Sequence, residues 1–266
     1  MRPGTASTMN ADRAEAAFWA AFLRNRNVDA GTSADGAVPV AGGFGLCLLG
    51  TFLEYGIGIG STRPLRPDDL AVLGEFYARR GLAARLELDE TVLARDRAVL
   101  AAGGYAEDGP RIAALEAAAG AGAAFAPVEG VVVRPAGDRR AWTELVVRGF
   151  ADTVAEDRQA RLRRTLQAAA AAAQGLFVAS VGGTDAGAGA VGISGDVAYL
   201  FGAAVLPAYR GHGVHRALVG ARMAFGLTRG ASRAALKTEP GSSAARSALR
   251  LGFELTALRR RVRAAA

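Results

Sequence analysis

The sequence has a single cysteine, Cys47, and no unbroken apolar run near twenty residues. One cysteine excludes an internal disulfide and a cysteine-based metal cluster, and the short apolar runs argue against a membrane-spanning helix. The N-terminus, MRPGTASTMNADRAEAAFWAAF, lacks the long apolar segment and the small-residue cleavage site of a secretory signal. We therefore expect a cytoplasmic protein that does not bind membranes.

Lysine is nearly absent as well, since Lys237 is the only one among 32 basic residues. Residues 1–126 carry 12 basic and 15 acidic residues, a net charge of −3, whereas residues 127–266 carry 20 and 10, a net charge of +10. A basic half suits an anionic ligand such as nucleic acid or a phosphorylated cofactor. Because the sequence shows no nucleic-acid motif and few aromatic residues among the arginines, we do not expect nucleic acid as the partner.

The length of 266 residues is enough for one large domain or two small ones, and half of the residues are apolar, which is enough for a sizeable core. A segment rich in Ala and Gly, residues 114–130, lies where the net charge changes sign. Its composition predicts a linker or the frayed end of a helix. We therefore predict two domains, at residues 1–126 and 127–266.

The second predicted domain alternates strand and helix patterns, which indicates a mixed α/β fold. The predicted strands span residues 131–136, 176–183, 187–194, 197–207, 232–240 and 253–263. The predicted helices span residues 141–150, 155–175, 213–229 and 242–252.

The first half repeats part of this pattern. A helical stretch ends at Gly81, a strand follows, and another helix closes at Gly104; the same order runs from Gly230 to Gly252. The two glycine spacings, 23 and 22 residues, favour an internal duplication over a coincidence between Ala-rich helices. The apolar residues 44–60 are predicted to pack on the second half and to cover part of its cleft.

The most informative stretch is AAVLPAYRGHGVHRALVG, residues 203–220, in which a strand leads through a turn into a helix. Such a turn presents successive backbone N–H groups and the positive end of the helix dipole. Gly211 and Gly213 let the backbone approach a phosphate closely, and Arg210 adds a charged, bidentate donor. The turn therefore predicts a pyrophosphate site.

Other nucleotide and metal sites fit this turn poorly. A P-loop needs Lys-Ser/Thr after its glycines, and the dinucleotide fingerprint needs a third spaced glycine; neither is present. Both histidines of the chain, His212 and His215, lie in the turn. They either add hydrogen-bond donors or are solvated, and without Asp, Glu or Cys nearby they do not predict a metal site.

With these residues the second half resembles the GNAT family of N-acetyltransferases. The family signature, Gln/Arg-x-x-Gly-x-Gly/Ala, corresponds to residues 210–215, and the preceding VLPAYRG matches its lead-in. EPGSSAARSALRLGF, residues 239–253, resembles the later helix that ends in Leu-Gly-Phe. The resemblance covers about residues 130–263. It implies a mixed central sheet, splayed at its centre and flanked by helices, in a fold of two GNAT-like halves packed together. The first half is then degenerate, because Ser61 stands where Arg210 does and no glycine pair follows.

The resemblance implies transfer of an acetyl group from acetyl-CoA to the amine of an acceptor, by direct attack in a ternary complex and without a metal. We expect a small-molecule acceptor, and the sequence leaves a small amine, an antibiotic, an amino acid and a protein N-terminus open. The cofactor contacts that it implies are Ala204, Val205, Leu206, Arg210, Gly211, His212, Gly213, Val214 and His215. Positioning and backbone stabilisation of the oxyanion would then supply much of the rate.

The sequence departs from the family at positions that concern the chemistry. The signature ends on His215 instead of Gly or Ala. Ala248 stands where the family often has a tyrosine that protonates the leaving thiolate, and Gly241 replaces a frequent asparagine. These departures keep a second interpretation open, a non-catalytic acyl-CoA-binding or regulatory protein.

A base must still take the proton of the ammonium. We predict Glu239 for this role, or for holding the ammonium by its charge, because it ends a strand just before Pro240. The alternative is that Glu239 is only a solvated turn residue, paired with Lys237 or Arg246. Tyr199 is a second candidate and Glu144 a weaker one, and a water relay would make no single residue essential.

Overall fold

The computed structural model describes residues 11–30, 35–118 and 127–265, with the backbone alone for residues 26–30. The helices are α1 (Ala11–Ala30), α2 (Pro67–Ala78), α3 (Glu90–Arg95), α4 (Arg97–Ala102), α5 (Arg139–Gly149), α6 (Glu156–Ala172), α7 (Val214–Leu227) and α8 (Ser243–Arg250). The strands of the first half are β1 (Gly36–Val40), β2 (Gly43–Cys47), β3 (Glu54–Ile57), β4 (Arg85–Asp89), β5 (Tyr105–Glu107) and β6 (Ile112–Ala118). Those of the second half are β7 (Val131–Pro135), β8 (Gly175–Val181), β9 (Thr184–Ser194), β10 (Val197–Val205), β11 (Arg233–Thr238) and β12 (Glu254–Ala264).

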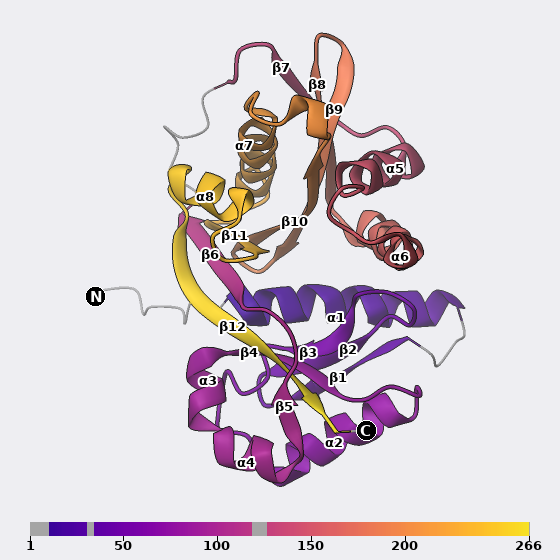
Figure 1. Ribbon diagram of the computed structural model, residues 1–266, viewed down its shortest axis with the longest axis vertical. Coiled ribbons are helices and arrows are strands. Elements are labelled where there is room, and N and C mark those ends of the chain that lie inside the picture. Colours follow the sequence, from indigo (N-terminus) through magenta and orange to yellow (C-terminus); the bar gives the residue numbers. More distant parts are fainter. Residues whose placement is uncertain (1–10, 31–34, 119–126, 266) are drawn as a thin grey trace.

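The strands form one mixed sheet that runs through both halves. Its order is β1-β2-β3-β4-β12-β6-β11-β10-β9-β8-β7, and β5 also pairs with β12. In the second half, α7 and α8 lie on one side of the sheet and α5 and α6 on the other (Figure 1). The predicted mixed α/β fold is therefore confirmed. Among the described residues, no helix is long and apolar enough to cross a membrane.

Each half contains a pair of parallel strands connected by a helix. In the first half β3 and β4 are parallel and α2 connects them. In the second half β10 and β11 are parallel and α7 connects them. Most other neighbouring strands are antiparallel, so this unit is distinctive, and its repetition agrees with the predicted duplication.

The two halves exchange their last strands. β6, from the first half, pairs with β11 on one side and with β12 on the other. β12, from the second half, continues past this contact to pair with β4 and β5. Figure 1 shows the two strands running alongside each other from one half into the other. Each half of the sheet is thus completed by a strand that the other half supplies.

This exchange corrects the prediction of a linker over residues 114–130. Residues 114–118 belong to β6, a strand with a neighbour on each side. Ala113, Ala114 and Ala117 are buried there, because small side chains fit between layers that cover both faces of the sheet. Residues 119–126, the rest of the expected linker up to the predicted domain boundary, lie outside the described residues.

Helix α1 lies between the two halves (Figure 1). Its Phe18, Trp19 and Leu23 are buried in a cluster that includes residues of β2 and β3 and also Tyr199 of β10. The predicted packing of residues 44–60 on the second half is confirmed, since the backbone N–H of Phe52 donates to Thr165 Oγ1 of α6 at 2.8 Å.

Candidate functional site

The predicted turn follows β10 directly and has the backbone that its glycines allow. A 3₁₀ turn spans Pro207–Tyr209, and the backbone N–H of Tyr209 donates to the carbonyl of Leu206. Gly211 has φ +84° and Gly213, the N-cap of α7, has φ +76°. Residues with a Cβ rarely adopt these angles, so the two glycines fix the path of the chain into the helix.

The backbone amides of this turn lack acceptors in the part of the chain that the structure describes. The N–H groups of residues 211–215 donate no hydrogen bond to any residue that the structure describes. The first turn of α7 also lacks an acidic side chain, and a Cβ atom on Gly211 would have no atom within 4 Å. Unpaired amides at the positive end of a helix form an anion site. Among the described residues no cluster of His, Cys, Asp and Glu could hold a metal ion.

Strands β10 and β11 separate next to this turn. Their parallel pairing ends at Leu200 and Leu236. Beyond that point β10 stays paired with β9 through a bulge between Phe201 and Ala204, and β11 stays paired with β6 up to Thr238. This separation agrees with the splayed sheet implied by the resemblance, and it brings Ala204, Val205 and Leu206 to the edge that leads to the turn.

Arg222 of α7 is hydrogen-bonded to the backbone at the bulge in β10, a role that the sequence did not predict. Its side chain is 1% exposed, and its guanidinium donates to the carbonyls of Ala190 and Phe201. Burial lowers its pKa to about 10, so it stays charged at neutral pH. A single arginine in a helix gives no sequence signal for such burial, because arginine is usually solvated.

The side chain of Arg210 is paired within the chain. Its guanidinium forms a bidentate pair with Asp152, and the hydrogen bond from Nη2 to Oδ1 measures 2.8 Å. It also donates to the carbonyls of Gly149 and Val205. The same hydrogen bonds lower the pKa of Asp152. Arg210 therefore links the turn to the end of α5. Because its guanidinium is paired with Asp152, less of its positive charge would act on a pyrophosphate.

The two histidines have different environments. His212 is exposed, and its Nδ1 lies 3.0 Å from the carbonyl oxygen of Arg210. The Nδ1 atom of His215 lies 3.2 Å from Oγ of Ser247 on α8. Burial, together with the charge of Arg222, lowers the pKa of His215 to about 4, so its imidazole is neutral at pH 7.

Glu239 follows β11 and is exposed. Its carboxylate forms no hydrogen bond or ion pair with the described part of the chain. Neither Lys237 nor Arg246 neutralises it, because Lys237 pairs with Glu15 and Glu87 and Arg246 donates to the carbonyl of Gly241.

The other residues considered for catalysis are buried or paired within the chain. Tyr199 is buried under α1, where its hydroxyl donates to Glu15 at 2.7 Å. Glu144 of α5 forms a bidentate pair with Arg163 on the outer face. Ala248 is fully buried in the core between α7 and α8. Glu15 had no sequence signal, although Lys237, the only lysine of the chain and a member of a largely apolar strand, could have indicated the polar cluster around it.

Comparison with known proteins agrees with this geometry. Residues 139–253 match the model of the acetyltransferase (GNAT) family. A GCN5-related N-acetyltransferase from Kribbella flavida is similar in fold, with a TM-score of 0.65 and 18% identity over 97% of both chains. A tandem GNAT protein from the clavulanic acid biosynthesis pathway has a TM-score of 0.57 and 14% identity, covering 78% of this chain and 73% of its own. No curated protein is similar enough in sequence to count as a relative. The separated strands and the turn, whose amides lack acceptors among the described residues, both lie within the matched region, and we conclude that residues 139–253 are a domain of the GNAT acetyltransferase family.

Proposed function

We propose that this protein transfers the acetyl group of acetyl-CoA to the amine of a small-molecule acceptor. The observation that carries this proposal is the run of unpaired N–H groups at residues 211–215, beside the diverging ends of β10 and β11. A pyrophosphate would accept from these amides, and the extended strand end at residues 204–206 would run beside the pantetheine arm. The net charge of +10 on residues 127–266 favours the same anionic co-substrate.

The chain's own groups then have distinct tasks. The turn and the strand end hold the thioester in place, and positioning of this kind supplies a large part of a transfer rate. Arg222, charged and buried beneath the bulge, favours negative charge developing near it. Glu239 has an exposed carboxylate at the end of β11, which suits an acceptor that arrives as an ammonium ion.

The site is tested with a charge placed beside the amides. Gly213→Asp would be ambiguous, because φ is +76° there and an added Cβ would lie 2.6 Å from Val128. His212 is exposed and has no such constraint. We expect His212→Asp to bind acetyl-CoA at least tenfold more weakly than the isosteric His212→Asn, a difference of about 1.4 kcal/mol in binding free energy. Equal affinities of the two variants by calorimetry would remove the site from this turn.

Catalysis is tested by thiol release from acetyl-CoA in the presence of a panel of amines. Release that depends on an amine supports the transferase. Acetyl-CoA binding without release for any amine would favour a regulatory acyl-CoA-binding protein instead. Tight DNA binding that weakens steeply as the salt concentration rises would instead support nucleic acid as the ligand.

Glu239→Gln separates two uses of that carboxylate. If Glu239 is the base, kcat falls about a hundredfold at neutral pH while acetyl-CoA affinity is unchanged. If it holds the ammonium, the KM of the acceptor rises and kcat changes little. Wild-type kcat and KM between pH 6 and 9 would exclude both.

A further inference from the structure

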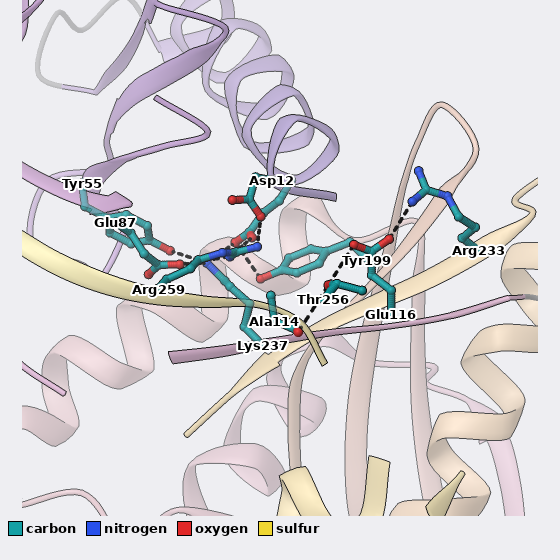
Figure 2. A network of polar contacts seen from close by, with 11 residues as sticks. Asp12, Tyr55, Glu87, Ala114, Glu116, Tyr199, Arg233, Lys237, Thr256 and Arg259 are labelled. Atoms are coloured by element: carbon teal, nitrogen blue, oxygen red, sulfur yellow. Dashed lines mark hydrogen bonds and ion pairs between the residues drawn. The ribbon is translucent and has the colours of Figure 1, made fainter. Parts of the chain in front are cut away.

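A buried polar cluster joins the two halves below the point where β10 and β11 separate. Its members come from α1 and from strands of both halves: Asp12, Glu15, Tyr55, Glu87, Tyr199, Lys237 and Arg259 (Figure 2). Glu15 is 2% exposed, and Glu87 and Arg259 are 1% exposed. So many charges are costly to bury unless they are paired, and the cluster is therefore held together by short contacts.

Glu15 is at the centre of these contacts. Its Oε1 accepts from the hydroxyl of Tyr199 at 2.7 Å and lies 2.7 Å from Nζ of Lys237. Lys237 is equally close to Glu87, and Nη1 of Arg259 lies 3.7 Å from Glu15 and 3.2 Å from Glu87. Burial, and then the charge of Glu87, raise the pKa of Glu15 even though Lys237 opposes them.

The cluster contains one more carboxylate than it has well-buried cations, so one added proton would balance its charges. Its two most buried cations, Lys237 and Arg259, are shared among three carboxylates, those of Asp12, Glu15 and Glu87. Arg261 reaches Glu87 at 3.4 Å, but its side chain is 42% exposed, so water weakens its contribution. Protonation of Glu15 would therefore leave the remaining charges balanced.

The cluster also borders the point where β10 and β11 separate. Tyr199 directly precedes Leu200, and Lys237 directly follows Leu236, the last pair before β10 and β11 separate. A cavity of about 10 Å³ lies here and is lined by Glu15, Tyr199 and Lys237, among others. This volume corresponds to about one water molecule, and its polar lining offers that molecule partners.

We propose that Tyr199 and Glu15 form the relay that takes the proton from the acceptor amine, so that a carboxylate of the first half serves the reaction of the second half. This inference rests on the proposed function. A proton passes from the ammonium through the cavity water to the Tyr199 oxygen, while the Tyr199 hydroxyl proton passes to Glu15. The free amine then forms the N–C bond and the C–S bond breaks. The second ammonium proton neutralises the thiolate, and Glu15 returns its proton to solvent. In this relay Tyr199 receives the proton from the cavity water, and Glu15 acts through Tyr199.

The test compares two tyrosines of the same cluster. Tyr199→Phe removes the hydroxyl next to Glu15, and Tyr55→Phe removes one that lies 3.4 Å from Lys237. We expect Tyr199→Phe to lower kcat at least tenfold at pH 7 and to abolish the fall of kcat toward acid pH. Tyr55→Phe should stay within twofold, and both variants should bind acetyl-CoA normally. An unchanged pH profile in Tyr199→Phe, or equal losses in both variants, would overturn the relay.

A second measurement does not depend on activity. Because the folded state binds the Glu15 proton more tightly than the unfolded state, wild-type stability should fall relative to Glu15→Gln as pH rises from 4.5 toward 8. The other ionisable groups of the cluster, those of Asp12, Tyr55, Glu87, Tyr199, Lys237 and Arg259, are present in both proteins. A constant difference in melting temperature would overturn the proton-accepting role of Glu15. Failure of the wild type to acetylate any amine refutes the proposed function itself, whereas transfer by an unimpaired Tyr199→Phe refutes the relay alone.

Discussion

The starts of helices α2 and α7 occupy equivalent places in the two halves but differ in what surrounds their amides. At α2, the N–H of Arg66 donates to Asp69 at 2.8 Å, and that of Leu65 donates to Asp96 at 3.2 Å. The carboxylate of Asp69 is held in addition by both Nη atoms of Arg63, at 2.6 and 2.7 Å. At α7, the amides of residues 211–215 have no acceptor among the described residues.

The same topology thus leaves the amides without acceptors among the described residues in one half and pairs them with carboxylates in the other. The first turn of α2 contains Asp68 and Asp69, so an incoming phosphate would meet negative charge and amides that already have partners. The first turn of α7 contains neither. An anion site at a helix start therefore depends on the absence of local acceptors as much as on the helix itself, and we expect one acetyl-CoA per chain.

The largest effect on both halves is expected from removal of β12, the strand that the second half supplies to the first. Deletion of residues 254–266 takes away the partner of β4 and β6 together. We expect loss of the cooperative folded state of both halves, seen as loss of amide-exchange protection in β4 as well as in β11. Deletion of residues 265–266 alone is the control. Native protection of β4 in the longer deletion would show that the first half folds by itself.

A change of pH distinguishes the halves next, because both histidines lie at α7. The pKa of His215 is about 4 in the folded protein and 6.5 without burial. Its contribution to stability is present above pH 6.5 and is lost as pH falls from 6.5 through 4, by about 3 kcal/mol. We expect His215→Gln to remove this slope in thermal unfolding, whereas His212→Asn should retain it. An unchanged slope in His215→Gln would mean that the imidazole is not desolvated.

The smallest effect on stability is expected from a substitution in the first half, at the start of α2. Asp69→Asn removes the carboxylate that Arg63 holds at the start of α2. We expect a loss of about 1 kcal/mol in the free energy of unfolding, typical of a helix-start carboxylate, measured with denaturant. No second acetyl-CoA site should appear, because Leu65 still donates to Asp96. A stoichiometry of two by calorimetry would contradict this account of the degenerate half.

The parts of this molecule that the sequence predicted are those encoded by local chemistry. Gly211 and Gly213 are needed for positive φ angles, and such a need is visible in the residue itself. The helix after them follows a periodic pattern that is also local. The separation of β10 and β11 was expected only through the family resemblance.

The unpredicted parts depend on distant partners. The Ala-rich residues of β6 have low intrinsic strand preference, and they form a strand because β11 and β12 supply neighbours on both sides. The pairing of Arg210 with Asp152 spans 58 positions, and that of Tyr199 with Glu15 spans 184. No pattern within a short window can predict such contacts.

The strand exchange has a consequence for the order in which the chain is made. During translation the first half leaves the ribosome while β4 and β6 still lack the strand that lies between them, since β12 is synthesised after both. Two strand edges of the first half therefore remain open to other chains until residues 254–264 arrive. The sheet of the nascent chain is completed only when β12 has been synthesised. A chaperone that covers open strand edges until then would raise the yield of folded protein.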